Sequence, residues 1–171
     1  LSFTDVFVPE ANLIGGKEGL GFIQLMMNLP LERLSIGVAA AAAGEAAFDW
    51  TRDYVISREA FGERVADFQN TRFRLADMAT TVDVMWAYID RAMELYAEKK
   101  LTAEEAAKVK FWATDREAEL LDVGVQLHGG YGYITEYPIA RAYLDARVHR
   151  IYGGTNGIMR DLVARQIVGK R

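Results

Sequence analysis

The sequence contains no cysteine and only two histidines, His128 and His149. Without thiols there is no disulfide framework, no thiolate nucleophile and no zinc or iron–sulfur site built on cysteine. No predicted helix carries a Glu-x-x-His pair, which argues against a di-iron bundle of the ferritin kind. We therefore predict that the protein binds no metal ion.

Long apolar runs and an excess of positive charge are also missing. The alanine stretch Ala39–Ala43 is short, weakly apolar and soon followed by Glu45, so no segment is predicted to span a membrane. A net charge of −4 argues against a nucleic-acid partner. With 51% hydrophobic and 26% charged residues, the composition is that of a globular domain with a real core.

Proline is rare, and Pro30 opens the longest pattern in the chain. Proline suits the first turn of a helix, and no comparable stop occurs before Gly62, so Leu29–Gly62 is predicted to be one long helix. The preceding stretch, Phe22–Leu29, is predicted to be a short apolar helix that Pro30 kinks or interrupts.

The middle of this helix is almost all alanine, with Gly37 and Gly44. Side chains this small allow either a neighbouring helix or a flat ligand to approach the backbone. At its start, Glu32 and Arg33 are either a solvated pair on the first turn or a catalytic pair.

Two more long helices are predicted after it. Apolar residues recur at steps of three and four up to Tyr96 in the first. The second starts at a capping box, Thr102 to Glu105, shows an interruption of its apolar pattern at Arg116 and should end at Gly129-Gly130.

A short helix around Ile139–Ala146 and a final helix over about Gly157–Val168 complete an all-α, up-down four-helix bundle. Ser2–Val8 is predicted to be a strand or the extended end of one. We therefore assign residues 1–16 to the tail of a preceding β domain and a linker, and residues 17–171 to the helical bundle domain.

Two glycine-containing motifs exceed the needs of packing. Gln126-Leu127-His128-Gly129-Gly130-Tyr131 is either a helix C-cap followed by a turn or a backbone site for phosphate. Gly153-Gly154-Thr155-Asn156 is either an ordinary helix cap or a site for an anion at a helix N-terminus.

Four motifs together resemble the C-terminal domain of the acyl-CoA dehydrogenase family. They are F-V-P-x-x-N-L-I-G near the start, R-x-x-F-G followed by F-Q-x-x-R, Q-L-H-G-G-Y-G-Y, and R-I-Y-G-G-T-N near the end. The order and spacing match the family over essentially the whole chain, most closely in its long-chain and isovaleryl-CoA branches.

The resemblance implies a flavoenzyme with FAD as cofactor that oxidises an acyl-CoA substrate to the trans-2-enoyl-CoA, involved in fatty acid beta-oxidation. It implies an electron-transfer flavoprotein as electron acceptor and a homodimer or homotetramer in which some FAD contacts cross to a neighbouring subunit. The compartment would be cytoplasmic in a bacterium or the mitochondrial matrix in a eukaryote.

Residues carried over from the family form two sets. Arg33 matches a position near the CoA adenine, and Gly154 one that touches the substrate. The implied FAD contacts are Arg58, Phe61, Gln69, Gln126, Gly129, Gly130, Thr155 and Asn156.

One departure decides the catalytic residue. Many relatives place the base in Tyr-Glu-Gly-Thr, where this chain reads Tyr152-Gly153-Gly154-Thr155, and a glycine accepts no proton. In the long-chain and isovaleryl branches the base lies in an L-x-x-E-R-L type segment, which matches Glu32. We therefore predict Glu32 as the base that removes the α proton, with the Gly153 N–H polarising the thioester carbonyl.

The missing carboxylate at Gly153 leaves other functions open. One is a helical domain that serves oligomerisation or acyl-CoA binding without dehydrogenation, and another is an acyl-CoA oxidase. These residues alone are expected to bind FAD weakly or not at all and to be inactive. Ala39–Ala43 would allow a medium or long acyl chain, but the sequence does not specify its length or branching.

Overall fold

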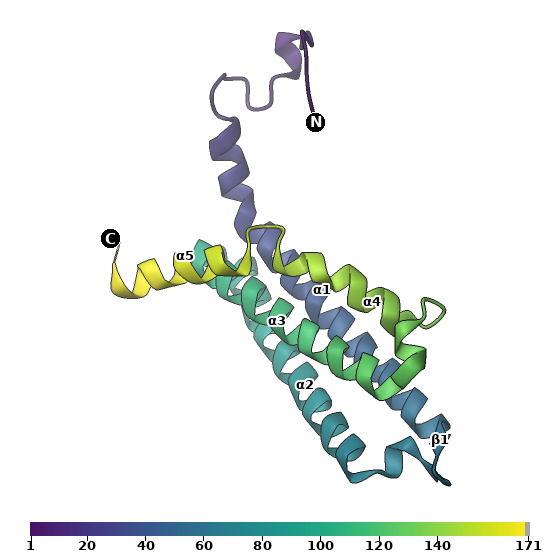
Figure 1. The fold of residues 1–171 in the computed structure, drawn as a ribbon. Helices are drawn as coiled ribbons and strands as arrows, with labels where there is room; N and C mark the ends of the chain where they lie inside the picture. The colour runs from purple at the N-terminus through teal and green to yellow at the C-terminus, as the bar shows by residue number, and fades with distance from the viewer. Residues whose placement is uncertain (170–171) are drawn as a thin grey trace.

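The computed structural model describes residues 1–169 and is almost entirely helical, as predicted. Four helices that alternate in direction form the bundle, and a fifth extends away from one end of it (Figure 1). The elements are α1 (Gly21–Ser57), β1 (Glu59–Ala60), β2 (Glu63–Arg64), α2 (Gln69–Ala97), α3 (Ala103–His128), α4 (Pro138–Ala146) and α5 (Asn156–Val168), with 3₁₀ turns η1 (Glu10–Asn12), η2 (Val65–Asp67), η3 (Gly129–Tyr133) and η4 (Arg147–Arg150).

Local capping signals set several helix ends where the sequence predicts them. The Thr102 hydroxyl accepts a hydrogen bond from the Glu105 N–H at 3.1 Å, which caps α3. Gly129 follows the end of α3 with a φ of 59°, a conformation that glycine adopts without a steric penalty. Thr155 caps α5 through the Ile158 N–H at 3.4 Å.

Helix α1 differs from its prediction at both ends. It begins at Gly21 and continues through Pro30, so Phe22–Leu29 is its first part rather than a separate helix. Proline removes a single N–H from the helical ladder, and the remaining bonds carry the helix across it.

At its other end α1 stops at Ser57, five residues before the predicted stop at Gly62. Arg58 is extended, and β1 and β2 then form a small antiparallel hairpin. Phe61 and Gly62, at the tip, have φ values of 57° and 83°, as two-residue hairpin turns of the I′ type require.

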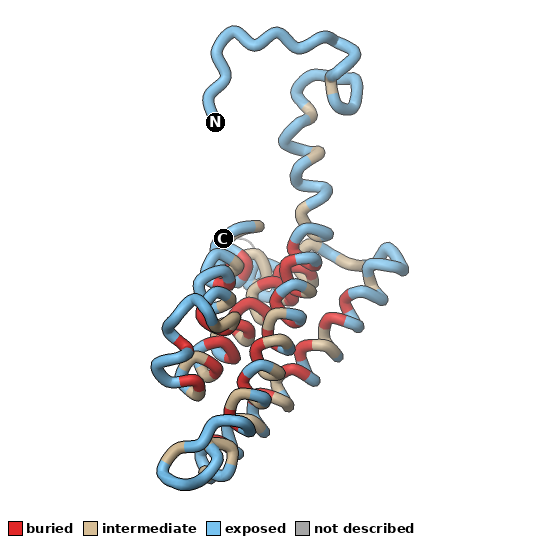
Figure 2. The backbone as a smooth tube through the Cα atoms, turned by 90° about the vertical axis from the view of Figure 1, so that its right-hand side faces the viewer, coloured by how far each residue is buried: buried red, intermediate tan, exposed pale blue. Residues whose placement is uncertain are grey.

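The predicted strand over Ser2–Val8 does not form in this structure. These residues are exposed and have no pairing partner among residues 1–169, and a single strand is not stable by itself. Together with the first turns of α1 they project away from the buried core (Figure 2). The assignment of residues 1–16 to a β domain stays a prediction, and Lys170 and Arg171 lie outside the described residues.

The small residues of α1 bring it close to α2 and α3. A Cβ atom at Gly37 would lie 2.6 Å from Cγ1 of Val109, and one at Gly44 would lie 2.7 Å from Cδ1 of Leu120. Real Cβ atoms essentially never approach so closely, so a larger residue at either position would force Val109 or Leu120 to move. Neighbouring helices therefore occupy the space beside Gly37 and Gly44. Within residues 1–169, no helix is both long and apolar enough to cross a bilayer.

Candidate functional site

The predicted site residues lie in two groups at opposite ends of the bundle. Arg33, on α1, contacts the segment Tyr152–Thr155, which we call the Gly153 turn, and Glu32 directly precedes Arg33 in the same helix. Arg58, Gly129 and Gly130 line a pocket at the other end, which we call the glycine pocket.

Two buried cations hold the Gly153 turn by its carbonyl groups. The Nε of Arg33 donates to the Gly153 oxygen at 3.1 Å. The Nζ of Lys110, on α3, donates to the Gly154 oxygen at 2.9 Å. The turn is thus tied to two helices that are far from it in the sequence.

Backbone conformation and packing both require glycine in this turn. Gly153 has a φ of 64° and Gly154 of 103°, which side chains rarely allow. A Cβ at Gly153 would lie 2.6 Å from Cδ1 of Ile36, and one at Gly154 would lie 2.6 Å from Cε of Met159. Gly153, the position that the family resemblance matches to a catalytic glutamate in many relatives, is therefore packed against α1.

Glu32 is exposed, and the negative charge of its carboxylate affects the pKa of its neighbour Arg33. Burial lowers the pKa of Arg33, and the negative charge of Glu32 opposes that change in part. Arg33 is bonded to Gly153, and Glu32 directly precedes Arg33 in α1; its role as the base stays a prediction. The predicted contact of Arg33 with CoA stays a prediction.

Asn156 lies in a buried polar network rather than on an open surface. Its Oδ1 accepts from Lys110 Nζ at 2.8 Å, and its Nδ2 donates to Thr114 Oγ1 at 3.0 Å and to Asp115 Oδ1 at 3.1 Å. Its side chain supports the start of α5, while Thr155 remains exposed. Whether either residue contacts FAD stays a prediction.

Lys110 was not predicted as a site residue from the sequence. Its side chain is fully buried. Burial lowers its pKa to about 8, and the nearby charge of Arg33 contributes to the decrease. The available signal was a lysine directly after Val109, on the apolar side of the predicted helix.

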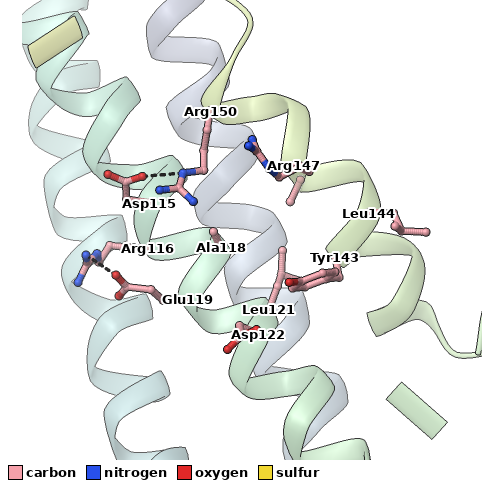
Figure 3. Close-up of a pocket in the computed structure, with 11 residues that line it drawn as sticks. Asp115, Arg116, Ala118, Glu119, Leu121, Asp122, Tyr143, Leu144, Arg147 and Arg150 are labelled. Carbon is pink, nitrogen blue, oxygen red and sulfur yellow. Dashed lines mark hydrogen bonds and ion pairs between the residues drawn. The ribbon is translucent and has the colours of Figure 1, made fainter. Parts of the chain in front are cut away.

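The interruption of the apolar pattern at Arg116 has a structural cause. Its neighbours Asp115 and Glu117 are buried and paired, Asp115 with Arg150 at 2.8 Å. Figure 3 shows this pair beside a cavity of about 570 Å³ between α3 and the α4–η4 segment. Its walls carry charges of both signs, and none of the predicted site residues lines it.

The glycine pocket has a volume of about 500 Å³. The guanidinium of Arg58 lies 5.5 Å from the centre of the Tyr131 ring. A Cβ at Gly129 or Gly130 would meet no atom within 4 Å, so the backbone there is open to a ligand. An arginine beside exposed glycine backbone suits a phosphate group, and the pocket therefore fits the pyrophosphate part of a dinucleotide such as FAD.

A buried histidine supports the wall of this pocket. The His128 ring stacks on Tyr54 with centres 4.2 Å apart, and the Tyr54 hydroxyl donates to the His128 carbonyl at 3.2 Å. Burial lowers the pKa of His128, and Nδ1 lies 2.8 Å from the Gly124 carbonyl.

Three more predicted cofactor residues are exposed around the same end of the bundle. Gln69 begins α2, Gln126 lies in the last turn of α3, and Phe61 is 99% exposed at the tip of the hairpin. The structure therefore brings together the predicted pyrophosphate contacts. At a rise of 1.5 Å per residue along α1, Arg58 lies about 38 Å from Arg33.

The family to which this architecture belongs is identified by sequence and structural comparison. The sequence model of the acyl-CoA dehydrogenase C-terminal domain matches residues 19–168. The long-chain specific acyl-CoA dehydrogenase of Mus musculus mitochondria is 48% identical over 98% of this chain and 39% of its own length.

Solved structures agree with this match. An acyl-CoA dehydrogenase from Geobacillus kaustophilus superimposes with a TM-score of 0.93 at 44% identity, covering 97% of this chain and 43% of that one. One from Bacillus anthracis, complexed with FAD, has a TM-score of 0.83 at 28% identity, covering 88% of this chain and 29% of that one. The chain thus spans well under half of these relatives, and it belongs to the acyl-CoA dehydrogenase family, whose C-terminal domain it matches.

Proposed function

We propose that this chain is the C-terminal part of an FAD-dependent acyl-CoA dehydrogenase in which Glu32 removes the α proton of an acyl-CoA thioester. The observation that carries this proposal is the contact between Arg33 and the Gly153 carbonyl. Glu32, the only carboxylate of the L-P-L-E-R-L segment, directly precedes Arg33 in the sequence, and this supports the proposal that it serves the turn in which, by the family resemblance, many relatives carry their base.

The residues around the turn have distinct roles in this mechanism. Glu32 accepts the proton, while Arg33 and Lys110 hold the Gly153 turn by its carbonyls. With these carbonyls occupied, the Gly153 N–H is the group proposed to donate to the thioester oxygen. That hydrogen bond would acidify the α carbon by stabilising the negative charge that develops on the oxygen.

The glycine pocket is proposed to hold the pyrophosphate of FAD through Arg58, Gly129 and Gly130. Bound FAD supplies the acceptor for the hydride that leaves the β carbon. Phe61, Gln69 and Gln126 surround the pocket, and Thr155 and Asn156 are proposed to face the flavin end.

Distance supports an assembly of at least two copies. About 38 Å along α1 separates Arg58 from Arg33, which exceeds the length of one FAD molecule. The glycine pocket of one copy and the Gly153 turn of another would therefore complete one FAD site. We propose a homodimer or homotetramer, with an electron-transfer flavoprotein as the electron acceptor. The compartment, bacterial cytoplasm or mitochondrial matrix, stays a prediction.

The decisive experiment is anaerobic mixing of the complete protein with a panel of straight and branched acyl-CoAs while the visible absorbance of the flavin is recorded. We expect the parent to bleach and Glu32→Gln to bind the same acyl-CoA without bleaching. A matched control, Glu94→Gln, removes an exposed carboxylate of α2 that is paired only with Arg91, and it should bleach as the parent does.

Each other outcome favours a different reading. Equal bleaching by the parent and Glu32→Gln would show that another group is the base. Binding of acyl-CoA by the parent without any bleaching would favour a helical binding or oligomerisation domain. Oxygen consumption during aerobic turnover would indicate an oxidase.

A further inference from the structure

A buried carboxylate is paired with a partly buried histidine that contacts the Gly153 turn. The Glu117 side chain, on α3, is fully buried. Nδ1 of His149, in η4, lies 2.8 and 2.9 Å from its two carboxylate oxygens. A carboxylate in such a place requires a partner, because an unpaired buried charge is strongly destabilising.

The pair reaches the turn through an aromatic contact. The His149 ring stacks on the Tyr152 ring with centres 5.4 Å apart and planes 6° apart. Tyr152 supplies the carbonyl half of the peptide whose N–H belongs to Gly153. Contacts therefore run from Glu117 through His149 to the side chain of Tyr152, the residue that shares its peptide group with Gly153.

The other charged groups near the turn act on different atoms. Arg33, from α1, and Lys110, from α3, bind the carbonyls of Gly153 and Gly154. Arg150, next to His149, is paired with Asp115. Glu117 and His149 thus support the Gly153 turn at Tyr152. Burial raises the pKa of Glu117, and burial together with the charge of Glu117 raises the pKa of Tyr152.

We propose that Glu117 and His149 are positioning residues that hold the Tyr152–Gly153 peptide, so that the Gly153 N–H is aimed at the carbonyl oxygen of the acyl thioester. Neither residue touches the substrate. This inference rests on the proposed function, and it assigns to the pair a role that is separate from proton removal by Glu32.

The test compares three variants of the complete, FAD-loaded protein. His149→Ala removes both the hydrogen bond and the stacking. Glu117→Gln keeps an acceptor for a neutral His149. The double variant Glu117→Ala/His149→Ala removes the stacking without leaving a carboxylate unpaired. Two quantities are measured: the anaerobic rate of flavin bleaching, and hydrogen exchange of residues 149–155 without substrate.

We expect His149→Ala to slow the maximal rate of bleaching about 10- to 100-fold, while the acyl-CoA concentration that gives half of that rate changes less than about twofold, because small displacements of a catalytic group have effects of this size. Exchange in residues 149–155 should be faster. Glu117→Gln should slow the bleaching less than about threefold. The double variant should unfold at a higher temperature than His149→Ala but bleach equally slowly.

Three results would overturn the proposal. The first is recovery of the parental rate by the double variant, which would leave the pair a purely stabilising role. The second is slow bleaching by His149→Ala with unchanged hydrogen exchange, and the third is a match between His149→Ala and the parent in both quantities. Glu98→Gln, an exposed control before α3, should match the parent. If the parent itself does not bleach, the proposed function fails, and the exchange comparison alone decides whether the pair holds the turn.

Discussion

At the scale of single residues, the Gly153 turn depends on groups whose importance comes from burial. Arg33 and Lys110 would be ordinary surface cations on most helices, yet here both are buried and bind carbonyl oxygens. A buried ammonium group loses its hydration, and its hydrogen bonds replace that hydration only in part. Lys110 therefore has an energetic signature that can be measured.

The lowered pKa of Lys110 predicts how the stability of the folded chain depends on pH. Its pKa of about 8 in the folded chain lies below the ordinary value, so between these values the unfolded state binds more protons. The free energy of unfolding should then rise between about pH 8 and 10, by up to roughly 3 kcal/mol. Urea unfolding at several pH values would measure this rise, compared with Lys110→Met, which lacks the titrating group. If the free energy of unfolding changed equally with pH in the parent and in Lys110→Met, the prediction would be contradicted.

At the scale of elements, the bundle is organised by the small residues of α1. The number of these small residues indicated that another group lies close to the backbone of α1. The structure shows that this group is helices α2 and α3. The apolar spacing predicted α2 and α3, because each helix presents its own stripe to the core. The hairpin at Glu59–Arg64 was missed, because its strands are only two residues long and its turn begins with an exposed phenylalanine.

Glycine-to-alanine substitutions at Gly37 and Gly157 should differ in their effect on the stability of the folded chain. At Gly37 the new methyl group would meet Val109, and overpacking of this kind costs about 1 to 3 kcal/mol. At Gly157, in α5, the nearest atom is 3.9 Å away, so the higher helix propensity of alanine should leave stability unchanged or raise it by up to about 1 kcal/mol. Thermal unfolding of both variants measures the contrast. Similar losses at both positions would show that the packing at Gly37 is not limiting.

At the scale of the whole molecule, the two halves of the proposed FAD site lie at opposite ends of the bundle. Glu32 and Gly153 are at one end, and Arg58 with the glycine pocket is at the other. In the proposed assembly, a single copy would contribute its two halves to two different FAD molecules. The proposed activity would then require at least two copies.

Mixed assemblies provide a direct test. Glu32→Gln and Arg58→Ala should each be inactive alone, the first through loss of the base and the second through weak FAD binding. In a mixed dimer, one site would carry both substitutions and the other would carry neither. Random mixing of equal amounts with excess FAD should therefore restore about one quarter of the parental activity. No recovery, despite mixed dimers detected by mass spectrometry, would mean that each copy completes its own site.

The sequence by itself determined that the long helices are present, where several of them are capped, and the family; the two ends of α1 were not among these features. These features depend on neighbours within about four residues or on motifs that are read directly, as at Thr102, Gly129 and the Q-L-H-G-G-Y segment. Only the tertiary structure decided which polar side chains are buried and what they hold. Arg33 meets Gly153 across 120 residues, and Lys110 meets Asn156 across 46. No local pattern encodes such contacts, because they arise only when separate helices pack and water is excluded between them.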